Sequence, residues 1–284
     1  MNDYLISVLL GIVEGLTEFL PISSTAHLRI AQDWLGISLE DGYWKTYAIV
    51  IQLGAILSVV WYFRVRLLDF VRSFPRGAEH AGPWLTHPLS LVMIAFVVTA
   101  GPAYLLDKKI GENLENLYVI GGALIVGGLV MWVVDALCRN PRTTDMVRMT
   151  LPQALWIGAA QILSAAFPGT SRSMATIAAG QLVGLSRPAA LEFSFFLSIP
   201  VMFAATGLKL AQAVFGHADA SGTALRLTGQ QWIVLLIGFV VSFVVALLTV
   251  HWLMGWVRRR GFAPFAVYRI VVGIIVIALA LRGA

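Results

Sequence analysis

Long apolar stretches separated by short polar segments dominate the chain. Six of them approach the length of about 20 residues that a helix needs to cross the hydrocarbon core of a bilayer. These stretches are residues 45–63, 89–107, 117–137, 189–209, 231–254 and 265–282. The pattern therefore predicts an all-α integral membrane protein with six transmembrane helices.

Two further apolar stretches are each interrupted in the middle. Residues 4–35 break at the sequence PISST, positions 21–25, and residues 151–185 break at PGTSRS, positions 168–173. Proline ends a helix, and backbone freed at membrane depth must be buried in protein or line a wet cavity. Each stretch is therefore predicted to form a re-entrant helix hairpin. Two tilted and kinked spanning helices are the alternative.

The two breaks belong to an internal repeat. Pro21 and Pro168 are 147 residues apart, and the same offset relates the hydrophobic segments that follow them without a gap. Three crossings in each half reverse the orientation of the second half, which gives an inverted-topology pair. The chain is thus interpreted as a single membrane domain, 1–284, with repeat halves of approximately 1–137 and 148–284.

Arginines gather in three loops that the six-crossing arrangement places on one side of the membrane. These loops are residues 64–88, 138–150 and 255–264. The positive-inside rule makes this side cytoplasmic. The first hairpin then enters from the periplasmic face and the second from the cytoplasmic face, so that their tips are expected to meet near the midplane.

Composition agrees with a membrane protein. The chain is 58% hydrophobic and 12% charged, whereas soluble domains carry roughly twice that charged fraction. The net charge of +5 needs no nucleic acid, because basic loops face anionic lipid headgroups. The single cysteine, Cys138, excludes an internal disulfide and a cysteine-based metal cluster. No Lys or Arg precedes Leu10, so the first apolar segment is expected to remain in the mature protein.

The first interrupted stretch carries two carboxylates. Glu14 and Glu18 are four residues apart and would share one face of a helix. Ionisable groups inside a membrane segment are costly and mark functional sites, and adjacent carboxylates repel unless a cation lies between them. A divalent cation, Mg²⁺ or Ca²⁺, is the simplest partner because it binds carboxylate and phosphate oxygens. A structural ion pair with Arg or Lys is the alternative. Gly11 and Gly15 would let a helix or a headgroup approach closely.

Hydroxyl groups and a histidine follow at the first break. A helix that begins near Ser24, with Thr25 beside it, presents free N–H groups that form an anion site. His27, one turn further on, is a candidate general acid or base. The ordinary alternatives are that the serines cap the helix and that the histidine only forms structural hydrogen bonds.

The second break supplies a positive charge. Gly169 lets the backbone approach a ligand, and Arg172 is able to bind phosphate oxygens through two parallel hydrogen bonds. The neighbouring hydroxyl groups are those of Thr170, Ser171 and Ser173. The alternative is that Arg172 is only the salt-bridge partner of the two glutamates. Together the two breaks form a credible pyrophosphate site, which does not by itself establish hydrolysis.

Two long motifs resemble a known family. EGLTEFLPISSTAH from Glu14 to His27, with PGTSRS from Pro168 to Ser173, resembles the signatures of the undecaprenyl-pyrophosphate phosphatase family of the BacA/UppP type. The stretches IQLG, EFSF and PFAVYR, at 51–54, 192–195 and 264–269, are also similar to that family. The resemblance extends over essentially the whole chain.

The resemblance implies an activity and a location. Undecaprenyl pyrophosphate would be hydrolysed to undecaprenyl phosphate and inorganic phosphate, which recycles the carrier lipid for peptidoglycan synthesis. It further implies a divalent cation, a bacterial inner membrane location with the active site facing the periplasm, and a link to bacitracin resistance. The expected partners are polyprenyl pyrophosphate and membrane lipids, without nucleic acid. Whether the chain forms a homodimer is left open.

Site residues follow from the motifs by position. The predicted catalytic residues are Glu18, Ser24, His27 and Arg172. The predicted substrate-binding residues are Glu14, Thr25, Gly169, Thr170, Ser171, Arg172 and Ser173. The predicted metal ligands are Glu14 and Glu18. The attacking group is either Ser24, activated by His27 or Glu18, or a metal-bound water, and the sequence does not choose between them.

Two other functions are weighed against this one. Broken helices in inverted repeats also occur in transporters, so a polyprenyl-phosphate flippase is the alternative. A type 2 phosphatidic-acid phosphatase is disfavoured because no histidine follows Ser171 and Arg172 at a suitable spacing. The next histidine, His217, falls in a predicted outer loop.

Overall fold

The fold is all-α. A computed structural model of the chain describes residues 2–37, 42–75, 84–111, 116–215 and 227–283. These residues form α1 (Asp3–Thr17), α2 (Ser24–Trp34), α3 (Gly42–Tyr62), α4 (Arg64–Ser73), α5 (Pro88–Gly111), α6 (Leu117–Leu137), α7 (Leu151–Ala166), α8 (Arg172–Leu182), α9 (Arg187–Phe215), α10 (Gly229–Arg260) and α11 (Ala263–Gly283). Two short 3₁₀ helices are η1 (Trp84–Thr86) and η2 (Met146–Arg148).

Five helices are long and apolar enough to cross a membrane. Within the described ranges these are α3, α6, α10, α11 and the part of α9 at Arg187–Gly207. The remaining predicted crossing, 89–107, falls in α5, Pro88–Gly111. The chain is therefore a multi-pass membrane protein, as predicted. His217 and residues 76–83 of the first arginine-rich loop lie outside the described residues.

Both predicted breaks separate two helices. α1 ends at Thr17 before α2 begins at Ser24, and α7 ends at Ala166 before α8 begins at Arg172. The residues just before α2 and α8 are Ser23 and Ser171, with φ angles of 75° and 69°. Residues other than glycine rarely adopt a φ angle in this left-handed region. The two turns therefore share an uncommon backbone geometry directly before a helix.

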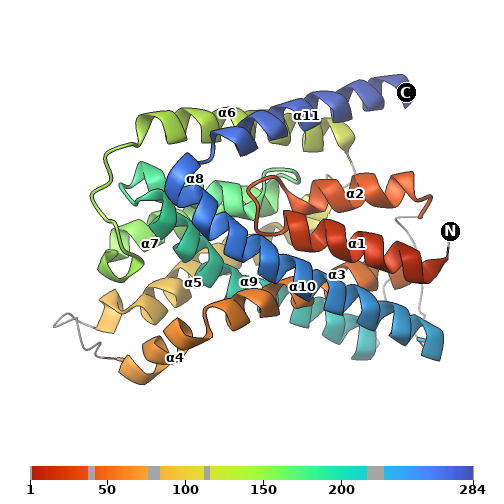
Figure 1. Cartoon of the computed structure of the whole chain (residues 1–284), viewed down its shortest axis with the longest axis horizontal. Helices are drawn as coiled ribbons and strands as arrows, with labels where there is room; N and C mark the ends of the chain where they lie inside the picture. Colours follow the sequence, from red (N-terminus) through yellow and green to blue (C-terminus); the bar gives the residue numbers. More distant parts are fainter. Residues whose placement is uncertain (1, 38–41, 76–83, 112–115, 216–226, 284) are drawn as a thin grey trace.

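Several pairs of helices pack closely along their length. α10 lies along both α1 and α3, α7 packs on α5, and α6 lies side by side with α11 (Figure 1). A Cβ atom added at Gly15 would lie 2.8 Å from the carbonyl oxygen of Ser242, and one added at Gly11 would lie 2.9 Å from that of Gly238. The two glycines therefore allow a helix, α10, to approach, which was one of the two predicted uses.

The arginine-rich connections meet at one end of the molecule. Arg66 of α4 pairs with Asp145, between α6 and α7, at 2.9 Å and with Glu192 of α9 at 2.6 Å. Asp135, near the end of α6, pairs with Arg187 at 2.6 Å and accepts a hydrogen bond from the backbone N–H of Phe262. Arg66 therefore joins the first predicted loop to the second, and Phe262 joins the third to the end of α6.

Candidate active site

Glu18 lies at the contact between the two turns. Its Oε1 accepts a hydrogen bond from Nη2 of Arg172 at 2.9 Å, and its Oε2 accepts one from Oγ of Ser24 at 2.5 Å. Its backbone carbonyl accepts a third bond from Oγ of Ser173 at 3.2 Å. All four residues are largely buried. The opposite charges of the two breaks therefore meet, as the sequence predicts.

Glu14 is a buried carboxylate without a hydrogen-bond partner. It is 0% exposed, and neither of its carboxylate oxygens accepts a hydrogen bond from any residue that the structure describes. Its electrostatic neighbours are Glu18 and Arg172. Burying an unpaired carboxylate is costly, so proteins normally supply a counter-charge or a proton at such a position. A proton shared with Glu18, or a bound cation, would offset the charge of Glu14 at this position.

Arg172 keeps hydrogen-bonding capacity beyond its pair with Glu18. It is the first residue of α8, and its Nη1 donates to the backbone carbonyl of Ser194 on α9 at 3.4 Å. A guanidinium carries further N–H donors in a fork that matches phosphate oxygens. Arg172 is thus held at a helix N-terminus, where the free N–H groups and the helix dipole also favour an anion.

His27 is occupied at both ring nitrogens. Its Nδ1 lies 2.7 Å from the carbonyl oxygen of Ser23, and its Nε2 lies 2.8 Å from the hydroxyl of Tyr268. Because a carbonyl only accepts, Nδ1 carries the proton, and Nε2 of the neutral ring accepts from Tyr268. The two rings are stacked with an interplanar angle of 11°. Of the two activators predicted for Ser24, the structure places Glu18, and not His27, at hydrogen-bond distance.

The remaining predicted residues have other surroundings. Thr25 is exposed, and no hydrogen bond of its side chain is found in the described part of the chain. Ser171 caps α8, because its side chain accepts from the backbone N–H of Met174 at 3.3 Å. Gly169 has a φ of 93°, and a Cβ there would lie 2.6 Å from the carbonyl oxygen of Ile120. Ser171 thus serves as a helix cap, and Gly169 allows a close approach between backbones.

Known proteins are similar to this chain along most of its length. The family described as bacitracin resistance protein BacA matches residues 7–275, a range that contains every residue of the site. The chain belongs to the BacA family. An undecaprenyl-diphosphatase of Koribacter versatilis is 57% identical and aligns with 99% of this chain and 100% of its own length. Undecaprenyl-diphosphatases of Caldanaerobacter subterraneus and Rhizobium etli are each 40% identical, covering 95% and 99% of this chain and 94% and 98% of theirs.

A buried arginine that the sequence-based site omits joins both turns of this BacA-family protein. Arg269 of α11 is 0% exposed. Its Nη1 donates to the carbonyl of Pro21 at 3.1 Å, and its Nη2 donates to those of Gly169 and Thr170 at 3.0 and 2.9 Å. A fourth bond reaches the carbonyl of Ala123 at 3.2 Å. An arginine inside an apolar span is a recognisable signal for function, and Arg269 also ends the PFAVYR stretch.

A divalent cation fits the carboxylates of the BacA-family site only together with other ligands. Both oxygens of Glu14 are available, whereas both oxygens of Glu18 already accept hydrogen bonds. Among the described residues there is no group of three His, Cys, Asp or Glu side chains suited to hold a metal. Magnesium is commonly held by one or two carboxylates plus substrate phosphates and water. Glu14 therefore fits as a ligand, and Glu18 fits once it releases a hydrogen bond.

Proposed function

We propose that this protein hydrolyses undecaprenyl pyrophosphate to undecaprenyl phosphate and inorganic phosphate. The three relatives described above are undecaprenyl-diphosphatases, and the one from Koribacter versatilis aligns along its whole length. The observation that carries the proposal is the direct contact of Arg172 with Glu18, which brings a phosphate-binding cation beside two carboxylates. Hydrolysis of a pyrophosphate is accelerated by a cation that stabilises the charge of the phosphoryl group and by a base that accepts the proton of the nucleophile.

Arg172 binds the terminal phosphate in this proposal. In the absence of substrate its guanidinium is neutralised by Glu18. A phosphate with more negative charge and more acceptor oxygens than one carboxylate competes for the same N–H groups. Arg172 then stabilises the charge that the phosphoryl group carries in the transition state, which is where electrostatic stabilisation accelerates the reaction. A divalent cation held by Glu14 and Glu18 would neutralise further phosphate oxygens.

Ser24 is the proposed nucleophile, and Glu18 is its proposed base. The 2.5 Å hydrogen bond from Oγ of Ser24 to Oε2 of Glu18 is the geometry that proton transfer requires. Oγ bonds to the terminal phosphorus, its proton passes to Glu18, and the bridging P–O bond breaks to release undecaprenyl phosphate. Water then hydrolyses the phosphoserine and yields inorganic phosphate. Direct attack by water, without a phosphoserine, is the alternative that the experiment below separates.

His27 is assigned a positioning role in the substrate-free protein. Its bonds to the carbonyl of Ser23 and the hydroxyl of Tyr268 link the start of α2 to α11. This link fixes the serine that precedes Ser24. The role of His27 as a general acid or base stays a prediction.

We further propose that α1–α2 and α7–α8 are re-entrant hairpins of two inverted halves. α1 and α7 have 15 and 16 residues, fewer than the roughly 20 that a crossing needs. α2 and α8 each have 11 residues and end before a glycine of positive φ, Gly36 or Gly184. The serines that precede α2 and α8, Ser23 and Ser171, correspond to each other in the two halves. Their separation along the chain is one residue longer than the offset between the two prolines. In this arrangement the arginine-rich end faces the cytoplasm and the site opens to the periplasm.

Phosphate release from a polyprenyl pyrophosphate, measured with purified protein in detergent, tests the proposed function. We expect release that a chelator suppresses and that added Mg²⁺ or Ca²⁺ restores. A folded protein that frees no phosphate but moves polyprenyl phosphate between leaflets of a vesicle would instead be a transporter. A burst of undecaprenyl phosphate with trapped phosphoserine would support Ser24, whereas steady release without it would support attack by water.

A further inference from the structure

Two buried serines of α9 form different kinds of hydrogen bond. Ser194 and Ser198 are four residues apart, and both are 0% exposed. Oγ of Ser198 donates to the carbonyl of Phe195 in its own helix at 2.6 Å, a local bond that a serine inside a helix can form. Oγ of Ser194 instead lies 2.7 Å from Oγ1 of Thr176 on α8. The hydroxyl of Ser194 therefore joins two helices, whereas that of Ser198 bonds within one.

The contact between the hydroxyls of Ser194 and Thr176 has a defined direction. Oγ1 of Thr176 carries one proton and lies 2.9 Å from the carbonyl oxygen of Arg172 and 3.2 Å from that of Ser173. Because carbonyls only accept, the proton of Thr176 is directed to them, and Ser194 is the donor to Thr176. The hydroxyl of Ser194 thus begins a chain of hydrogen bonds that ends on the backbone of Arg172.

The backbone of Ser194 also bonds the guanidinium of Arg172. The carbonyl of Ser194 accepts from Nη1 of Arg172 at 3.4 Å. α9 therefore holds Arg172 at two points, at its backbone through Thr176 and at its guanidinium through this carbonyl. A long side chain such as arginine has many rotamers. Two fixed points restrict the guanidinium of Arg172 to the position in which it meets Glu18.

The residue after Ser194 packs beside the other partner of this ion pair. The ring of Phe195 lies edge-to-face against that of Phe19, the neighbour of Glu18 in the chain, with the ring centroids 5.3 Å apart. Both rings are 0% exposed. Close-packed interiors leave such rings little room to shift. Two adjacent residues of α9 therefore hold the two sides of the contact between Glu18 and Arg172.

We propose that Ser194 is a positioning residue that aims the guanidinium of Arg172 at the terminal phosphate. The proposal rests on the proposed phosphatase function and adds a residue of a third segment, α9, to the two turns. Without the hydroxyl of Ser194, Thr176 keeps its bonds to the start of α8, but this start is no longer tied to α9. A displaced guanidinium stabilises the transition state less well. The loss should therefore fall mainly on kcat.

Ser194→Ala tests this role in two measurements on the purified full chain in detergent. The first is kcat and KM for phosphate release from a polyprenyl pyrophosphate. The second is the Kd of a polyprenyl methylenediphosphonate, in which a CH₂ group replaces the bridging oxygen and prevents hydrolysis. We expect kcat to fall at least about tenfold. KM and Kd should rise only about threefold, as for one modest hydrogen bond. Ser194→Cys, which keeps a weak donor, should recover part of kcat.

A double substitution shows whether Ser194 acts through Arg172. In an Arg172→Ala background, Ser194→Ala should leave Kd unchanged, because the side chain that it positions is already absent. An equal rise in Kd in both backgrounds would overturn the proposal, since Ser194 would then act on the ligand by another route.

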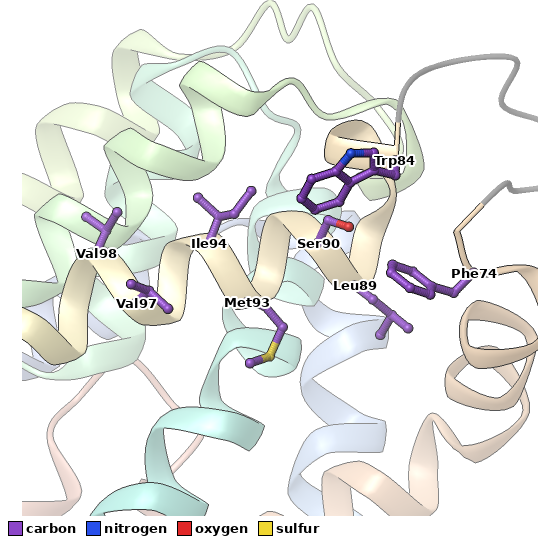
Figure 2. Close-up of a pocket in the computed structure, with 8 residues that line it drawn as sticks. All are labelled: Phe74, Trp84, Leu89, Ser90, Met93, Ile94, Val97 and Val98. Atoms are coloured by element: carbon purple, nitrogen blue, oxygen red, sulfur yellow. The ribbon is translucent and has the colours of Figure 1, made fainter.

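Ser198→Ala is the matched control, because it removes a hydroxyl of equal burial from the same helix. A second control is Val97→Ala, at an exposed side chain in an apolar groove lined by α5 together with Phe74 and Trp84 (Figure 2). Both controls should keep kcat and Kd within about twofold of the unaltered protein, since neither touches the bonds of Arg172.

Two results would contradict the role of Ser194. One is a kcat and a Kd within about twofold of the unaltered protein in Ser194→Ala. The other is an equal loss in Ser198→Ala, because α9 would then need its buried hydroxyls only for folding. If the unaltered protein binds the diphosphonate but releases no phosphate, the proposed phosphatase function fails. The Kd values in the two backgrounds then decide the role of Ser194 by themselves.

Discussion

Arg269 offers a sharp test of how the site is held together. Its guanidinium donates four hydrogen bonds, and three of them end on carbonyls of the two turns, at Pro21, Gly169 and Thr170. Arg269→Lys keeps the charge but replaces the fork by a single ammonium, which cannot reach carbonyls on both sides. If two bonds are lost at about 1.5–3 kcal/mol each, the variant is destabilised by about 3–6 kcal/mol.

The loss of these hydrogen bonds in Arg269→Lys should lower the rate of catalysis as well as the stability. When the turns separate, Arg172 and Ser24 no longer face the same phosphate, and a displacement near 1 Å costs roughly 100-fold in rate. We expect Arg269→Lys to lower kcat for phosphate release by about that factor, with a smaller change in KM. The same samples should show a lower Tm, followed by thermal unfolding in detergent.

Ser7→Ala is the matched control for this experiment. Ser7 is also buried, and its Oγ donates to the carbonyl of Val234 at 2.6 Å, joining α1 to α10 far along the chain from the turns. Its removal should lower Tm while kcat stays within about tenfold, since neither turn loses a contact. If Arg269→Lys lowers Tm but keeps the kcat of the unaltered protein, Arg269 is only structural and the reasoning fails.

Three further substitutions test the roles proposed in the site. Arg172→Ala should reduce phosphate release by several orders of magnitude in a protein that still folds and inserts, and activity within tenfold of the unaltered protein would remove Arg172 from the site. Ser24→Ala should abolish both turnover and the phosphoserine detected by mass spectrometry, whereas largely retained turnover would favour attack by water. Glu14→Gln should raise Tm in the presence of a chelator, because an amide cannot repel the neighbouring carboxylate of Glu18. The same variant should lose the increase in Tm that Mg²⁺ gives the unaltered protein; an unchanged increase would place the cation elsewhere.

The local sequence predicted much of the architecture. Apolar stretches of sufficient length predicted the spanning helices, because hydrocarbon admits only helices with satisfied backbones. Pro21 and Pro168 marked both breaks, because proline cannot continue a helix. Glu14, Glu18 and Arg172 were recognisable as functional because charges are costly in apolar segments.

Tertiary structure decided which of these groups bond to one another. The sequence left both Glu18 and His27 as possible activators of Ser24, but packing turns His27 towards Tyr268, 241 positions away. Arg269 reaches Pro21 across 248 positions, a contact that no local pattern reports. The physical reason is that hydrophobicity and proline act within one segment, whereas hydrogen-bond partners depend on how helices rotate and pack. The sequence alone therefore determined most of the long apolar helices, the breaks and the charges, and the packing determined the geometry of the site.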